Sequence, residues 1–361
     1  MDIGVDISGI TSIKRTGVEN MSYQFLLHLL KLDKTNRYYL YTRNRISDNS
    51  LKSPNTTERF LPFPRYWHKL RLPIELLLHK PDIFLAIGYM VPFCSPKKTI
   101  VFIHDLAFRY YPEAYSAKEL FLQEYALNTA IKHASKLICV SESTRKDLIK
   151  FCNVTTDKTT VIHLAHDNKL FRHSSTKPAR SKEKPYVLFV GRLESRKNVV
   201  GIIKAFARFK KTTNLPHKLV LVGKPGHGYD KIENEIVASG NIRDDIVVTG
   251  YVSNSELANL YSGADAFVFP TLYEGFGIPI LEAMASGTPV ITSTTSSMPE
   301  VAGDAAVLVD PTNISDITDA LNKLLTNPAL KKAYVAKGLE RAQQFSWDSS
   351  ASKLLSIINE L

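Results

Sequence analysis

The feature that most constrains this chain is an alternation of short β-branched or aromatic runs with helical patterns such as 118–133 and 199–211. The pattern is typical of parallel sheets, because parallel neighbours need long crossover connections. Before residue 171 the expected strands are 3–7, 38–42, 83–87, 99–104, 137–140 and 160–163. After residue 185 they are 186–190, 218–222, 246–248, 266–270, 289–292 and 306–309.

A polar segment separates these two sets of runs. It contains Pro178 and Pro185 and has no apolar period, so it predicts a linker. A chain of 361 residues also exceeds one ordinary domain. We therefore expect an α/β protein of two doubly wound, Rossmann-like domains facing a cleft that binds the substrate. The expected parts are a first domain at 1–171, a linker at 172–184, a second domain at 185–343 and a terminal helix at 344–361.

The net charge of +11 lies entirely in the first half of the chain. Residues 1–180 contain 27 Lys and Arg against 16 Asp and Glu, whereas residues 181–361 contain 19 of each kind. Such asymmetry indicates an anionic partner: acidic lipid, a phosphate-bearing substrate or nucleic acid. The segment 65–80 mixes cations with aromatic residues and leucines. It can lie in a membrane interface, or it can pack its leucines inward and expose its charges.

The sequence shows no membrane-spanning run and no signal-peptide pattern. An uninterrupted apolar stretch of roughly 18 residues is absent from the sequence. The first residues run directly into a strand pattern, without the basic and apolar regions of a signal peptide. We therefore expect a cytoplasmic protein that can still bind a membrane surface.

The clearest ligand-binding pattern is the segment 274–282. It follows an expected strand, places Gly275 and Gly277 in a loop, and puts Pro279 in the first turn of a helix. A helix start preceded by glycines offers backbone N–H groups to an anion such as a diphosphate. The carboxylates at the two ends of the segment can each accept hydrogen bonds from hydroxyl groups. The combination predicts a site for a nucleotide-sugar.

Two cations are expected at the same anion. Arg192 and Lys197 lie between the strand 186–190 and the next helix, where they can neutralise a diphosphate. Arg196 is assigned to solvent, the usual environment of such side chains. The chain has no Asp-x-Asp sequence and no metal-ligand spacing. We therefore expect neither a metal nor a cofactor. A nicotinamide dehydrogenase is disfavoured because no G-x-G-x-x-G follows a strand.

The run 265–290 resembles the signature of the retaining glycosyltransferases of family 4, which have the two-domain GT-B fold. The segments 191–198, 249–252 and 297–304 are similar to further motifs of that family. The resemblance covers the second half almost continuously and is thinner in the first half. In the family, the terminal helix crosses back onto the first domain.

The resemblance implies roles for individual residues. Glu274 would contact the donor sugar and act in catalysis, Glu282 would bind the ribose, and His104 would hydrogen-bond the sugar or position the acceptor. His104 can equally be a structural histidine, and Gly17 a plain loop glycine. Ser141 is a weaker acceptor-side candidate. The implied donor-binding residues are Gly17, Arg192, Lys197, Tyr251, Val252, Glu274, Gly275, Phe276, Gly277, Ile278 and Glu282.

The overall pattern looks closest to bacterial O-antigen and polysaccharide mannosyltransferases. This implies a retaining, metal-independent α-mannosyltransferase that uses GDP-mannose. Its acceptor would be a saccharide linked to undecaprenyl diphosphate, as in O-antigen or lipopolysaccharide biosynthesis, at the cytosolic face of the inner membrane. A UDP-sugar donor and a same-fold nucleotide-sugar epimerase or hydrolase remain alternatives. A nucleic-acid-binding protein would explain the basic half but would leave the donor residues without a purpose.

Overall fold

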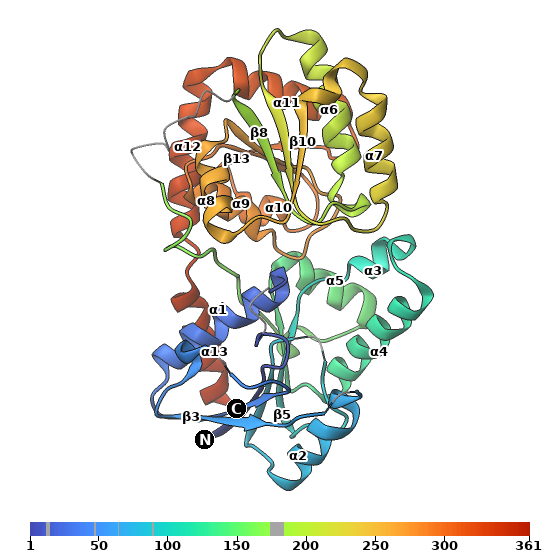
Figure 1. The fold of residues 1–361 in the computed structure, drawn as a ribbon. Helices are drawn as coiled ribbons and strands as arrows, with labels where there is room; N and C mark the ends of the chain where they lie inside the picture. Colours follow the sequence, from blue (N-terminus) through green and yellow to red (C-terminus); the bar gives the residue numbers. More distant parts are fainter. Residues whose placement is uncertain (12–14, 47, 64, 89, 174–183) are drawn as a thin grey trace. The chain divides into compact units, whose positions relative to one another are not determined.

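The structure is a computed structural model. It describes residues 1–361 except 12–14, 47, 64, 89 and 174–183 (Figure 1). The described residues form two compact units. The first contains Met1–Leu106, Ser116–Leu164 and Ser346–Leu361, and the second contains Ala107–Tyr115 and Ala165–Phe345. The linker expected at 172–184 lies almost entirely outside the described residues.

The first unit is built on a seven-stranded sheet in the order β3-β2-β1-β4-β5-β6-β7, with every neighbouring pair parallel. Its strands are β1 (Asp2–Asp6), β2 (Arg37–Thr42), β3 (Thr56–Phe60), β4 (Ile83–Ala86), β5 (Lys98–Ile103), β6 (Lys136–Cys139) and β7 (Thr159–Val161). Strand β3 is not among the strands expected from the sequence. It lies at the edge of the sheet and is only partly buried, so its Thr-Thr-Glu-Arg-Phe sequence lacks a long apolar run.

Helices cover both faces of this sheet. They are α1 (Gly17–Leu32), α2 (Leu72–Leu78), α4 (Ala117–His133), α5 (Glu142–Cys152) and α13 (Trp347–Glu360), with a π-helix η2 (Trp67–Arg71) and 3₁₀ turns η1 (Asn49–Leu51) and η4 (Thr156–Lys158). The β1-to-β2 crossover runs in the opposite direction to those from β3 to β4 and from β5 to β6. Right-handed crossovers therefore place α1 on one face and α2 and α4 on the other.

Helix α13 closes the α1 face of the first unit. The Phe25 and Trp347 rings meet edge to face with centroids 5.5 Å apart. His28 Nδ1 lies 2.6 Å from Asp348 Oδ1, and Ser350 Oγ donates a hydrogen bond of 2.6 Å to the His163 carbonyl. The last helix of the chain thus belongs to the unit formed by the first strands.

The second unit contains a six-stranded parallel sheet in the order β10-β9-β8-β11-β12-β13. Its strands are β8 (Tyr186–Val190), β9 (Lys218–Val222), β10 (Ile246–Gly250), β11 (Ala266–Phe269), β12 (Val290–Ser293) and β13 (Ala306–Val309). Strands β11 and β12 are buried along their whole length, as expected for a parallel sheet covered by helices on both faces. The rings of Phe189, Phe267 and Phe269 stack with centroid distances of 5.7–5.8 Å between neighbours in this core.

The helices of the second unit follow the same alternation. They are α3 (Ala107–Tyr110), α6 (Val199–Thr212), α7 (Tyr229–Ala238), α8 (Asn254–Gly263), α9 (Ile278–Ala285), α10 (Met298–Ala302), α11 (Ile314–Thr326) and α12 (Pro328–Gln343), with 3₁₀ turns η3 (Pro112–Ala114), η5 (Ser195–Lys197) and η6 (Gly240–Asp245). Among the described residues, no helix combines the length and the apolar character needed to cross a membrane.

Candidate active site

The segment 274–282 connects the carboxyl end of β11 to the start of α9. Gly277 is the N-cap of α9 and has a φ of +96°, which lies in the left-handed region that favours glycine. A Cβ at this position would also collide with the side chain of Met298. Pro279 lies in the first turn of the helix, where its missing N–H leaves no bond unmade. The sequence therefore fixes where α9 begins.

Two serines hold the loop in place. The buried Ser297 Oγ lies within donating distance of the carbonyls of Glu274 (2.8 Å) and Phe276 (3.1 Å). The backbone N–H of Glu274 donates to Ser296 Oγ at 3.0 Å. These bonds fix the backbone on both sides of Gly275. The sequence motif 297–304 marks this region, but its spacing says nothing about which serine bonds to which carbonyl.

A cluster of opposite charges surrounds the first carboxylate. Lys197 Nζ and Glu274 Oε1 form an ion pair, and Arg196 Nη1 lies 3.8 Å from Glu274 Oε2. All three side chains are largely buried, and charges in such surroundings need partners. The structure therefore brings Lys197 and Glu274 together at the carboxyl edge of the sheet.

Arg196 is more buried than the sequence suggests, whereas the diphosphate-binding role expected for the exposed Arg192 stays a prediction. Arg196, assigned above to solvent, has a side chain only 15% exposed. It donates to the Tyr273 carbonyl at 2.8 Å and pairs with Glu194 at 2.9 Å. Arg192 is 66% exposed, and its Nε lies 3.8 Å from Glu194. Arg196 is thus the functional candidate that sequence reasoning missed, because both arginines precede the same helix and only tertiary packing separates them.

The second carboxylate has a different environment. Glu282, on α9, accepts a hydrogen bond of 2.9 Å from the buried Tyr261 hydroxyl. Burial raises the pKa of Glu282 to about 7; the bond from Tyr261 opposes this rise, and the negative charge of Asp167 adds to it. The Tyr261 ring packs edge to face on Phe171 and Phe267, with centroids 5.5 and 5.4 Å away. Glu282 therefore changes charge near neutral pH.

The segment Ala107–Tyr115 covers the loop before Glu274 within the second unit. The Tyr110 and Tyr273 rings pack with centroids 5.0 Å apart and an angle of 32° between their planes. The Tyr111 hydroxyl lies 3.5 Å from the Leu272 carbonyl. Nothing in the sequence pattern assigns this segment to the second unit.

The remaining donor candidates lie around the same sheet edge. Tyr251 follows β10 with its side chain 54% exposed, and Lys224 Nζ lies 5.2 Å from the centre of its ring. Val252 and Ile278 are half-buried, whereas Gly275 and Phe276 are buried. An exposed aromatic ring at a strand end is suited to stack on a nucleotide base.

Of the three candidates in the first unit, His104 and Ser141 follow the carboxyl ends of β5 and β6, and Gly17 begins the helix after β1. The Nε2–H of the buried His104 donates to the Ile87 carbonyl at 2.9 Å, and burial lowers the pKa of this histidine. Ser141 caps α5 by accepting from the Thr144 N–H at 3.0 Å. Gly17 is the first residue of α1, and a Cβ there would meet no atom within 4 Å. These bonds give Ser141 and His104 structural contacts, and their acceptor-side roles stay predictions.

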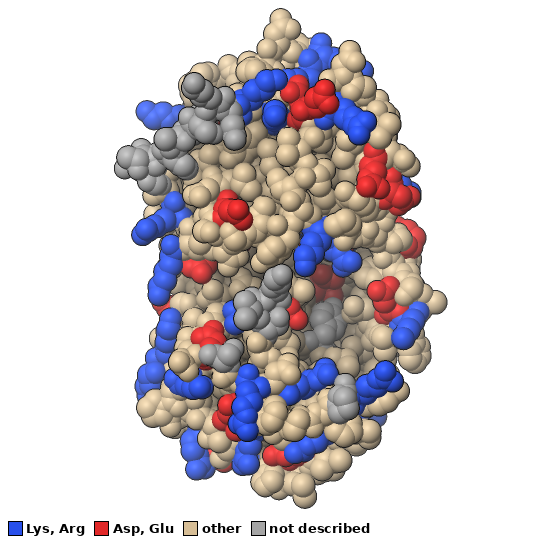
Figure 2. All heavy atoms as spheres, viewed as in Figure 1, with Lys and Arg blue, Asp and Glu red and all other residues tan. Residues whose placement is uncertain are grey.

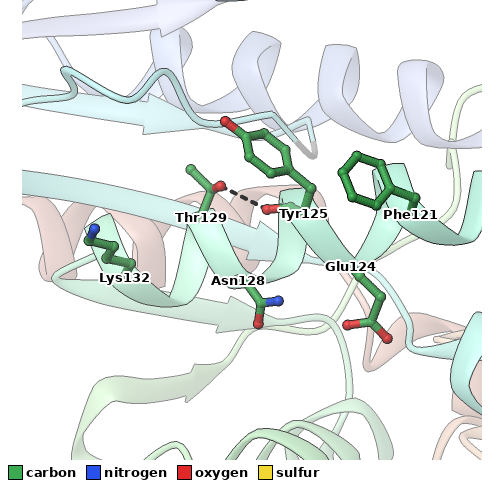
Figure 3. A pocket seen from close by; sticks show the side chains of 6 residues that line it. All are labelled: Phe121, Glu124, Tyr125, Asn128, Thr129 and Lys132. Carbon is green, nitrogen blue, oxygen red and sulfur yellow. Dashed lines mark hydrogen bonds between the residues drawn. The ribbon is translucent and has the colours of Figure 1, made fainter.

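A hollow of about 320 Å³ lies along α4, and none of the candidate residues is among those that line it (Figure 3). Phe121 and Tyr125 project on one side of the helix, as the close view shows. Its lining residues are Phe121, Glu124, Tyr125, Asn128, Thr129 and Lys132. Within the described residues, no group of three or more His, Cys, Asp or Glu side chains is placed to hold a metal ion.

Comparison with known proteins shows which family the chain belongs to. The model of Glycosyltransferase Family 4 matches residues 16–169, and the model of Glycosyl transferases group 1 matches residues 171–341. The O-antigen chain mannosyltransferase B of Escherichia coli is 30% identical over 297 residues, which cover 81% of this chain and 77% of that protein. The O-antigen chain mannosyltransferase RfbU of Salmonella typhimurium is 28% identical over 288 residues, covering 76% and 77%.

A solved structure extends the comparison to the whole fold. Sucrose-phosphate synthase from Thermosynechococcus elongatus superposes with a TM-score of 0.80 at 20% identity, over 99% of this chain and 98% of that one. The two parallel sheets and these matches define a glycosyltransferase with the GT-B fold. The chain belongs to glycosyltransferase family 4, with a group 1 second half. The family and fold expected from the sequence are confirmed.

Proposed function

We propose that this glycosyltransferase is a retaining α-mannosyltransferase. In this proposal it transfers mannose from GDP-mannose to a hydroxyl of an undecaprenyl-diphosphate-linked saccharide, in O-antigen, lipopolysaccharide or related polysaccharide biosynthesis. The charged cluster of Lys197, Arg196 and Glu274 beside the start of α9 is the observation that carries it. The names of the two bacterial relatives support mannose as the sugar and a glycan as the acceptor.

The charged cluster suggests how the donor enters. In the structure, Lys197 and Arg196 neutralise the Glu274 carboxylate. A bound diphosphate at the α9 N-terminus would compete for these cations, because it is the stronger anion and helix N–H groups favour it. Glu274 would then be released to accept hydrogen bonds from sugar hydroxyls. Donor binding would thus exchange one anion for another around the same two cations.

The transfer step follows from these positions. The bond between the anomeric carbon and the donor phosphate breaks, and the acceptor oxygen bonds to the same face of that carbon. The acceptor proton passes to the departing phosphate oxygen. Lys197, Arg196 and the start of α9 stabilise the negative charge on the leaving diphosphate. Glu274 orients the sugar and supports the positive charge that develops on its ring.

Because of these residues, we propose that the reaction does not require a metal ion. The cations and the helix start supply the positive field that a bound metal provides in other transferases. Full activity of the purified protein in excess EDTA is the expected result. A loss of activity that Mg²⁺ or Mn²⁺ restores would contradict metal independence and leave the donor assignment untouched.

The acceptor side belongs to the first unit in this proposal. His104 and Ser141 follow the carboxyl ends of β5 and β6, where open α/β sheets bind their ligands, and Gly17 begins the helix that follows β1. A lipid-linked acceptor requires the protein to work at a membrane surface, which we place at the cytosolic face of the inner membrane. Figure 2 shows Lys and Arg side chains spread over the visible surface of the first unit, in keeping with an anionic partner.

A donor screen tests the proposal directly. The melting midpoint of the purified protein is measured against increasing GDP-mannose, GDP, UDP-glucose and UDP, because a ligand of the native state raises it with concentration. We expect stabilisation by GDP-mannose and GDP. A response to the UDP compounds alone would replace the donor assignment. Sugar released without any acceptor would favour a hydrolase or epimerase of the same fold.

A further inference from the structure

One short segment of the first unit exposes apolar side chains in an unusual concentration. It consists of η2 and α2, residues 67–78, with the cations on either side. Leu77 and Leu78 are 66% and 70% exposed, and Leu70 and Ile74 are about half exposed. These four positions are spaced for one side of a helix. In the described part of the second unit, large exposed apolar residues are few and lie on separate elements.

The exposed leucines are not the side chains by which this segment packs onto the rest of the protein. The segment already buries Leu72 and Leu76 toward the sheet. Trp67 is buried as well, and its indole N–H donates to the Leu61 carbonyl at 2.8 Å. A helix that is apolar on both sides needs a second apolar environment, and contiguous exposed leucines mark an interaction surface.

The charges around the face are of one sign. Within residues 65–80 the only acidic residue is Glu75. It is buried and paired with Arg71 and His79, each at 3.2 Å. Lys69 and Lys80 are exposed. Leucines flanked by cations, with no exposed carboxylate within residues 65–80, match the acyl chains and phosphates of an acidic lipid surface.

The segment is tied to the candidate acceptor edge. His68 Nε2, on η2, lies 2.8 Å from Asp6 Oδ2 at the end of β1. The ends of β5 and β6, which carry His104 and Ser141, belong to the same edge of this parallel sheet. Helix α4, on the same face of the sheet as α2, also exposes Phe121 and its neighbours. A surface bound through this segment would therefore lie beside the place where the acceptor is expected.

We propose that residues 65–80 form the membrane-docking surface of the protein. Leu70, Ile74, Leu77 and Leu78 enter the interface of an anionic bilayer, and Lys69 and Lys80 contact its phosphates. The inference deepens the proposed function, on whose lipid-linked acceptor it rests, but its main test, vesicle binding, needs neither donor nor acceptor.

Vesicle binding by the full chain is the test. The protein is centrifuged with vesicles of phosphatidylcholine, with or without phosphatidylglycerol. We expect binding to the mixed vesicles that weakens with salt. Replacing both exposed leucines (L77S with L78S) lowers the partition coefficient at least about tenfold, because each buried leucine contributes substantially to transfer. The charge reversal K69E with K80E lowers it about tenfold on mixed vesicles only.

Matched controls separate docking from folding. Val237→Ser removes an apolar side chain that is 61% exposed in the second unit, and Lys211→Glu reverses an exposed cation there. Both should bind vesicles like the parent protein, and all variants should keep its melting midpoint. Transfer to a water-soluble acceptor should also persist in L77S with L78S, which separates this inference from the proposed function. Unchanged vesicle binding by the folded variant L77S with L78S would overturn the inference. A second result would also overturn it: the parent protein binds no vesicles but forms a dimer, and the L77S with L78S variant does not.

Discussion

Glu274 and Glu282 are the first and last residues of the segment 274–282, yet their surroundings differ. Glu274 meets two cations, Lys197 and Arg196. Glu282 has a neutral partner, the Tyr261 hydroxyl, and burial raises its pKa to about 7. Two glutamates eight positions apart therefore have different electrostatic surroundings, which their residue type and spacing do not reveal. The partners around each carboxylate, two cations for Glu274 and one buried hydroxyl for Glu282, set them apart.

The largest effect is expected at Glu274, the carboxylate paired with two cations. Glu274→Gln keeps the size of the side chain but removes the charge that supports the developing cation. We expect turnover to fall roughly 10²–10³-fold, the usual cost of losing one electrostatic contact to the transition state. The measurement is kcat with saturating donor. Asp245→Asn is the control, because Asp245 pairs with Lys210 at 2.9 Å on another part of the second unit. Near-normal turnover of E274Q would end the assigned role.

The next effect concerns the cation that the sequence placed in solvent. Arg196→Lys keeps the charge but loses the planar group that joins Tyr273, Glu194 and Glu274. We expect kcat/KM to drop about tenfold or more, with an unchanged melting midpoint. Arg208→Lys, at a surface hydrogen bond to Ser315, should have no such effect. Equal activities of the two variants would return Arg196 to a purely structural role.

The titrating carboxylate predicts a pH dependence. We expect donor affinity to increase as pH rises through about 7, because the ionised Glu282 accepts hydroxyl bonds more strongly. Glu282→Gln should flatten this profile and lower affinity a few-fold above pH 7. Isothermal calorimetry between pH 5.5 and 8.5 measures the donor affinity of both proteins. The midpoint of the profile should lie within about a unit of pH 7. A profile that Gln leaves unchanged would assign the pH dependence to another group.

The same group predicts the pH dependence of stability. Its pKa in the folded protein lies above the ordinary value of 4.5, so protonation favours the folded state. The contribution is present below pH 4.5 and is lost as pH rises through about 7. The melting midpoint of Glu282→Gln, relative to the parent, should therefore improve as pH rises across that window. An opposite trend would place the carboxylate in a stabilising charged environment.

The smallest effect tests the hydrogen bond to this carboxylate. Tyr261→Phe removes a bond that lowers the pKa of Glu282, so the pKa should rise further. A net hydrogen bond is worth about 1 kcal/mol, which corresponds to a shift of less than one unit in the midpoint of donor binding. Tyr186→Phe is the matched control, because that hydroxyl bonds the Leu260 carbonyl instead. A midpoint that moves down would contradict the geometry.

The sequence predicts the second unit better than the first for a physical reason. Strands β8, β9, β11 and β12 are largely buried, so they appear as apolar runs, and Gly277 before α9 has a local conformational cause. The edge strand β3 is half exposed and carries no such signal. In the site, Lys197 and Glu274 could be named from their motifs. The burial of Arg196, the serine bonds to the loop and the Tyr261 hydroxyl depend on residues far apart in the chain.

The placement of α13 has a consequence for how the protein is made. Its contacts with α1 belong to the first unit, but its sequence follows the whole of the second unit. During translation, the first unit therefore stays incomplete until α13, which follows the second unit, has left the ribosome. The nascent chain must carry an unfinished α1 surface for that time, open to chaperones. If the two halves were expressed as separate fragments, α13 would be part of the second fragment and absent from the first, to which its contacts belong.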